Sequence, residues 1–163
     1  MISLCKAVLV LYVTFLLWLV LFKFSSEPLS VLANYQSRSL NLVPFAGYSM
    51  GTMREMLDNL IVFIPAGLLL SANFAHVGLW RKLAWVFMLS AAAEVLQYVF
   101  AIGTTDITDV IMNTLGGLTG LGAYALVGKF VDKRKLDVFI CVTLAVLIVL
   151  FIILRFMVFK VRY

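Results

Sequence analysis

Residues 83–127 read LAWVFMLSAAAEVLQYVFAIGTTDITDVIMNTLGGLTGLGAYALV. Two long apolar runs stand on either side of a short turn, residues 103–106, that contains no Lys or Arg. A membrane-spanning helix needs about 20 mostly apolar residues. The stretch therefore predicts two neighbouring transmembrane helices, at 83–102 and 107–127, joined by a tight connection.

The composition of the whole chain agrees with this prediction. Of its 163 residues, 64% are hydrophobic and 13% are charged, whereas a soluble domain carries about 25% charged residues. This excludes an ordinary soluble domain, a disordered chain and a disulfide scaffold. The net charge of +5 is typical of topology signals and contact with phospholipid headgroups. Membrane lipids are therefore expected partners, and nucleic acid is not, because it would need a solvated basic face.

Three further apolar segments, at 7–22, 56–74 and 138–154, are also candidates for transmembrane helices. The first lacks a small-residue cleavage site, so we expect it to be retained rather than removed as a signal peptide. The predicted fold is an all-α, polytopic membrane helical bundle of about five transmembrane helices, with 1–163 as a single membrane domain. A long extracellular loop, 25–55, is expected between the first two helices.

Positive charge between the helices predicts their orientation in a bacterial plasma membrane. Basic residues cluster in two of the connections, at Arg81 and Lys82 and then at Lys129, Lys133, Arg134 and Lys135. The positive-inside rule places these loops in the cytoplasm. The N-terminus is then cytoplasmic and the C-terminus outside. An even number of spans, with a re-entrant fifth segment, is the alternative.

The two cysteines, Cys5 and Cys141, lie within or beside apolar runs. Neither has a Cys or His neighbour at the spacing of a zinc site. We expect two buried, unpaired thiols that pack as small hydrophobic groups, and neither a metal site nor a cofactor.

Polar residues inside the spans gather toward the predicted outer ends of three helices. Because ionisable groups are costly in a bilayer, they are candidates for function. With Arg38 of the loop as a counter-charge, alongside Arg54, they predict a partly buried, outward-open pocket. The predicted ligand-binding residues are Arg38, Asn59, Glu94, Gln97, Asp106, Asp109 and Asn113, and the candidates for acid–base catalysis are Glu94, Asp109 and Asp106.

Several of these residues also have a structural interpretation. Asp106 could cap the following helix, and Asp58 and Asn59 could stabilise the start of theirs. Gln97 and Asn113 could join helices through hydrogen bonds. Glu94 lies in the middle of its helix, so capping does not explain it.

Gly116 and Gly120 form a small-xxx-small pattern that lets two helices approach closely. We expect this pattern to pack helices within one molecule. An oligomer formed through it is the alternative and is not expected.

Four segments, in this order and spacing, resemble the VanZ-like family: LVPF at 42–45, DNLIVFIPAG at 58–67, EVLQ at 94–97 and DITDVIMNTLGG at 106–117. The family is associated with resistance to the glycopeptide antibiotic teicoplanin in Gram-positive bacteria. One difference stands out, because many members have an Arg about six residues before the position of Asp109, where this chain has Gly103. If that Arg pairs with a carboxylate, Arg38 and Arg54 are the available substitutes here.

The resemblance implies a cell-envelope protein for antibiotic resistance. It would act without catalysis from an outer-leaflet pocket that binds a lipoglycopeptide, its lipid anchor or a lipid-linked cell-wall precursor. The alternative is a membrane-embedded enzyme that uses carboxylates on a lipid-linked envelope substrate. A small transporter or flippase is a third alternative, which the absence of an internal repeat disfavours.

Overall fold

The structure is a computed structural model that describes residues 2–22, 39–47, 49–102 and 104–161. Its long helices are α1 (Ile2–Leu21), α3 (Met50–Asn73), α4 (Leu79–Phe100), α5 (Ile107–Val127) and α6 (Lys133–Val161). Within these described residues, five helices are long and apolar enough to cross a membrane. The predicted all-α bundle of about five transmembrane helices is confirmed, and the chain is a multi-pass membrane protein.

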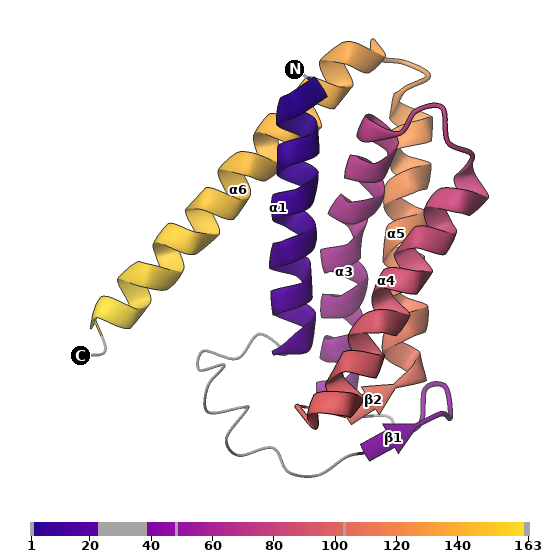
Figure 1. The fold of residues 1–163 in the computed structure, drawn as a ribbon, viewed down its shortest axis with the longest axis vertical. Helices are drawn as coiled ribbons and strands as arrows, with labels where there is room; N and C mark the ends of the chain where they lie inside the picture. The colour runs from indigo at the N-terminus through magenta and orange to yellow at the C-terminus, as the bar shows by residue number, and fades with distance from the viewer. Residues whose placement is uncertain (1, 23–38, 48, 103, 162–163) are drawn as a thin grey trace.

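The helices run alternately up and down, so that the connections fall at two ends of the bundle (Figure 1). The start of α1, the α3–α4 connection and the α5–α6 connection lie at one end, which we call the basic end because it holds Lys82, Lys129 and Lys133–Lys135. The end of α1 and two short strands lie at the other, which we call the strand end (Figure 1). The arrangement brings both predicted cytoplasmic connections to the same side, although the orientation itself stays a prediction.

The boundaries of α5 agree with the prediction, whereas α3 begins six residues earlier than predicted. Ser49 caps α3, because its side chain accepts a hydrogen bond from the Thr52 N–H at 3.2 Å while the Thr52 hydroxyl accepts one from the Ser49 N–H at 2.8 Å. Residues 50–55 are therefore helical and not part of a loop 25–55. The idea that Asp58 and Asn59 stabilise the helix start is wrong, because they lie in its third turn. Residues 23–38 of the predicted loop lie outside the described residues.

Two three-residue strands, which the sequence analysis did not predict, form a parallel pair at the strand end (Figure 1). They are β1 (Ser39–Asn41) and β2 (Thr104–Asp106), with Asn41 opposite Asp106. β2 occupies the predicted turn between α4 and α5, so the pair connects the segment before α3 to the junction of α4 and α5.

The closest helix packing joins α3 and α5 through glycine. A Cβ atom on Gly116 would lie 2.1 Å from the Leu60 carbonyl oxygen, and one on Gly120 would lie 2.1 Å from that of Ile64. Only hydrogen fits in these positions, so the backbones of the two helices are in direct contact. The expectation that Gly116 and Gly120 pack helices within the molecule is confirmed.

The first and last helices are joined by a disulfide between Cys5 and Cys141. The expectation of two unpaired thiols is therefore wrong. Helical packing brings α6 against α1 near the basic end, where both cysteines lie, and α6 then diverges from the bundle toward its C-terminus (Figure 1). Near the disulfide, the Asn73 side chain also donates a hydrogen bond to the Cys5 carbonyl oxygen at 3.1 Å.

Candidate functional site

A cavity of about 520 Å³ opens at the strand end, between α1, α3 and α5. The apolar part of its wall comes from the last turn of α1. The polar part comes mainly from one face of α3, whose positions recur every three or four residues. Its lining residues are Leu19, Val20, Gly51, Arg54, Glu55, Asp58, Asn59 and Asp109.

The lining of this cavity is acidic. Glu55, Asp58 and Asp109 contribute three carboxyl groups, and Arg54 contributes one guanidinium. The Arg54 Nε atom lies 3.8 Å from Asp58 Oδ2, but both side chains are exposed, so water screens this pair and it is weak. Because its acidic groups outnumber its one guanidinium, the cavity favours a ligand that carries a positively charged group.

Asp109 and Asn59 are the two predicted ligand-binding residues that line this cavity. Asp109 lies in the first turn of α5 and is buried. A carboxylate there interacts favourably with the positive end of the helix dipole. Asn59 faces the same space from the third turn of α3, at a depth set by the early start of that helix.

Glu94 is buried on α4 and accepts two hydrogen bonds from β2. Its Oε2 atom accepts a hydrogen bond from the backbone N–H of Asp106 at 3.0 Å, and its backbone oxygen accepts one from the Thr105 hydroxyl at 3.1 Å. The carboxylate thus holds the chain at the point where β2 passes into α5. Glu94 does not line the cavity between α1, α3 and α5.

Asp106 joins the strand pair to α5. Its Oδ1 atom accepts a hydrogen bond from the Thr108 N–H at 2.7 Å, which is the capping interaction considered from the sequence. Its Oδ2 atom accepts one from the Asn41 side chain at 2.9 Å. Since both oxygens are engaged, Asp106 fixes the start of α5 and the register of β1 against β2.

Gln97 and Asn113 form hydrogen bonds between helices. Gln97 donates to the Val20 carbonyl oxygen at 2.9 Å, and this oxygen is one of the last carbonyls of α1, which lack partners within their own helix. Asn113 on α5 donates to the Ser90 hydroxyl on α4 at 2.8 Å. Because Val20 lines the cavity, Gln97 also positions part of the cavity wall.

The structure thus divides the predicted pocket into two parts. The cavity contains Asn59 and Asp109, whereas Glu94, Gln97, Asp106 and Asn113 hold the elements around it. Arg38 lies outside the described residues. Sequence reasoning missed Gly51 and Glu55 as cavity residues because it placed the helix start at residue 56, and it left Asp58 out of the ligand-binding set although the predicted helix contains this residue. The spacing of Gly51, Arg54, Glu55, Asp58 and Asn59 along one helical face was the available signal.

Among residues 2–22, 39–47, 49–102 and 104–161, no three His, Cys, Asp or Glu side chains lie close enough together to hold a metal ion. The hydrogen bonds described above position helices and strands. The cavity places charged and hydrogen-bonding groups beside an apolar wall.

Three of the four segments with a family resemblance, 58–67, 94–97 and 106–117, contain polar residues of this site. Comparison with known proteins agrees with the resemblance. The family model described as VanZ/LLP1 matches residues 9–128. The chain belongs to the VanZ/LLP1 family. Protein VanZ of Enterococcus faecium is similar to it, with 49% identity over 151 residues that cover 91% of this chain and 92% of the relative. No solved structure matches the chain.

The part matched by the VanZ/LLP1 model contains the cavity and the contacts around Glu94. It begins within α1 and ends just after α5, so α6 lies beyond it. α6 is likewise absent from the cavity lining. The matched part therefore includes the segments of α1, α3 and α5 that line the cavity, together with α4 and the strand pair.

Proposed function

We propose that this VanZ/LLP1 protein gives a Gram-positive bacterium resistance to teicoplanin. It would act at the outer face of the plasma membrane, by binding the lipid-tailed antibiotic, its lipid anchor or a lipid-linked cell-wall precursor. The observation that carries the proposal is the position of the acidic cavity at the strand end, opposite the basic end. The positive-inside rule predicts the basic end to be cytoplasmic, so the cavity would face outward.

The composition of the cavity wall supports a ligand with two kinds of surface. Leu19 and Val20 of α1 are apolar and lie beside the acidic face of α3. A lipid chain partitions into the apolar part of the bilayer, while a cationic or hydrogen-bonding group meets the carboxylates. A lipid-tailed molecule at the outer interface presents both surfaces at this depth.

The experiment is to express the chain in a teicoplanin-susceptible Gram-positive host and to measure the minimum inhibitory concentration. We expect Asp109→Asn and Asn59→Leu to lower it toward the value of the host without the protein, because the first removes a negative charge from the cavity and the second removes an amide group. Immunoblots of membrane fractions establish equal abundance of each variant.

Asp132→Asn is the matched control. Asp132 is exposed at the basic end, and its side chain accepts a hydrogen bond from the Lys135 N–H at 3.1 Å. Asn caps a helix as well as Asp, so this variant should keep full protection. Full protection by both cavity variants at normal abundance would contradict the proposal.

The enzymatic alternative depends mainly on Asp109. Of the three candidates for acid–base catalysis, it alone lines the cavity, because Glu94 and Asp106 hold β2 and the start of α5. Glu55 and Asp58 line the same cavity and are the carboxyl groups with which Asp109 would have to act as acid or base. The apolar wall formed by Leu19 and Val20 suits a lipid-tailed ligand in either case, and we keep binding as the proposed function.

A further inference from the structure

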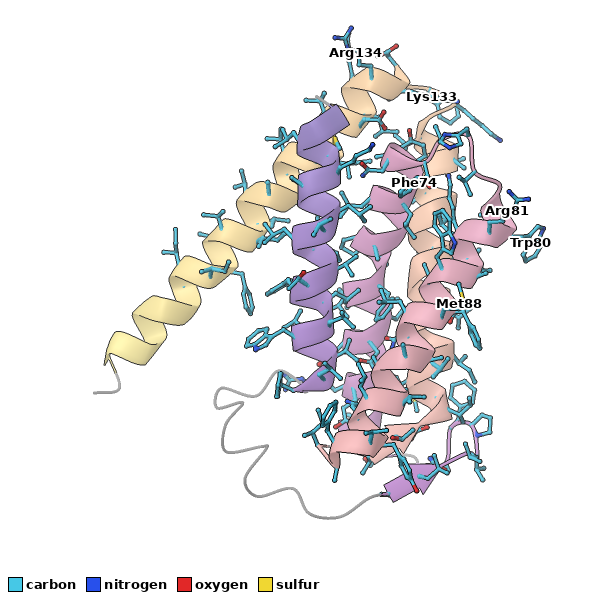
Figure 2. The ribbon with its side chains drawn as sticks, in the orientation of Figure 1. Phe74, Trp80, Arg81, Met88, Lys133 and Arg134 are labelled. Atoms are coloured by element: carbon cyan, nitrogen blue, oxygen red, sulfur yellow. A yellow bond between two sulfur atoms is a disulfide. The ribbon has the colours of Figure 1, made fainter. Side chains whose placement is uncertain are left out.

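A second cavity, of about 310 Å³, lies at the basic end, where α3, α4, α5 and α6 meet. Three lysines from three different parts of the chain line it, namely Lys82, Lys129 and Lys133, and none of its lining residues is acidic. Figure 2 shows Lys133 at this end of the molecule, together with Phe74 and Arg81 near the α3–α4 connection. We call this space the lysine cavity.

Lys82 is the residue that requires an explanation. It is only 7% exposed, and it lies in the first turn of α4, which begins at Leu79. A cation in the first turn of a helix faces the positive end of the helix dipole. Burial adds a second cost, because a buried charge loses its hydration. Lys82 would therefore be destabilising unless an opposite charge lies nearby.

The described part of the chain does not supply that opposite charge. Over residues 4–22, 39–47, 49–102 and 104–154, whose side chains the structure describes, no ion pair or side-chain hydrogen bond joins Lys82 to another residue. Asp137 is the acidic group bonded to a lining residue, but its Oδ1 atom accepts the Tyr124 hydroxyl at 2.7 Å and Asp137 does not line the cavity.

The start of α4 adds a second feature that favours an anion. The N-cap residue is Gly78, which has no side chain, so no side-chain hydrogen bond caps the first turn. The first N–H groups of a helix have no partner within the helix, and together with the dipole they form a common binding site for phosphate. Leu79 of this first turn lines the cavity beside Lys82.

Lys129 by itself has a simpler explanation, because it follows the C-terminal end of α5, where a cation is stabilised by the helix dipole. Lys82 has no such explanation, since it lies at the opposite end of its own helix. The combination of a buried lysine, an uncapped helix start and two further lysines is what points to a ligand.

We infer that the lysine cavity binds a phosphate-bearing anion, with Lys82 and the start of α4 as its centre and Lys129 and Lys133 at its edge. The anion is the phosphate of an anionic phospholipid headgroup or a free phosphate group. Basic pockets between transmembrane helices on the cytoplasmic side bind such headgroups. This site is separate from the acidic cavity at the strand end and does not depend on its function.

The test measures the thermal unfolding of the purified full-length chain in a neutral detergent by its tryptophan fluorescence. The additions are phosphatidylglycerol, phosphatidylcholine and inorganic phosphate, each at equal concentration. A ligand that binds the folded state raises the unfolding temperature. We expect phosphatidylglycerol to raise it by on the order of 5 °C near saturation, and phosphatidylcholine to have no effect.

The Lys82→Met variant should lose this rise, because Met keeps the length and apolar body of the side chain without its charge. Lys135→Met is the control, since Lys135 is exposed on α6 and does not line the lysine cavity. If Lys82→Met does not fold, the double variant Lys129→Met and Lys133→Met replaces it, because both of these lysines are exposed. This double variant should also lose most of the rise.

The arms of the experiment separate the two sources of the anion. A rise with phosphatidylglycerol alone assigns the cavity to a lipid headgroup, and an equal rise with inorganic phosphate assigns it to a free phosphate group. The inference is overturned if neither addition has an effect, or if Lys82→Met and the double variant respond as the unaltered chain does. An equal response to phosphatidylcholine overturns it as well.

Discussion

Replacing Gly120 by Ala tests whether backbone contact between α3 and α5 holds the bundle together. The added Cβ would lie 2.1 Å from the Ile64 carbonyl oxygen, whereas carbon–oxygen contacts across helix interfaces are normally about 3.3–3.6 Å. The helices must therefore separate locally by about 1 Å. Such overpacking costs about 1–3 kcal/mol, and a backbone oxygen cannot turn aside as a flexible side chain can.

Gly122→Ala, on the same helix, is the matched control. A Cβ atom on Gly122 would meet no heavy atom within 4 Å. Both variants gain the same helix propensity, about 0.5–1 kcal/mol for Gly to Ala. The difference in stability between the two variants therefore isolates the cost of packing.

The assay is thermal unfolding of the purified chain in detergent, with both variants in the same preparation. For a chain of this size, about 2–4 °C corresponds to 1 kcal/mol, so Gly120→Ala should unfold roughly 2–12 °C below Gly122→Ala. Equal unfolding temperatures, or a higher one for Gly120→Ala, would refute the close contact between α3 and α5.

Three further predictions concern the orientation in the membrane, the hydrogen bonds to β2 and the proposed function. In a chain whose native cysteines are replaced by Ser, a membrane-impermeant thiol reagent should label Thr104→Cys in intact cells and should leave Lys133→Cys unlabelled; the opposite pattern would invert the predicted orientation. Glu94→Ala should lower the unfolding temperature more than Glu94→Gln, because Gln can still accept the Asp106 N–H, and equal losses would show that this hydrogen bond does not hold β2. Protection should be stronger against lipid-tailed glycopeptides than against untailed ones, and equal inhibitory concentrations would count against binding at the membrane interface.

The helices could be predicted from the sequence where apolar content and capping agree. α5 was predicted with its observed ends because Asp106 provides a cap immediately before a long apolar run. The start of α3 was missed because Met53 is the one apolar side chain between Gly51 and Glu55 in its first turns. An apolar window therefore places the helix start too late, although the capping pair Ser49 and Thr52 marks it in the sequence.

The strand pair and the disulfide could not be predicted because each depends on contacts between distant segments. Asn41 and Asp106 are far apart in the sequence, and three-residue strands carry almost no local signal. Cys5 and Cys141 are separated by 136 positions, so their pairing follows only from the packing of α6 against α1. The polar residues were assigned to one pocket for the same reason, because their division into cavity residues and residues that join helices depends on which distant segments they contact.

The bond between Cys5 and Cys141 gives the polypeptide the connectivity of a ring. The closed loop contains most of α1 and all of α3, α4 and α5. The few residues before Cys5 and the chain after Cys141, which includes most of α6, lie outside it. A protease that cuts once between the two cysteines therefore leaves a single covalent molecule. Its two fragments separate on a gel only after the sulfur–sulfur bond has been reduced.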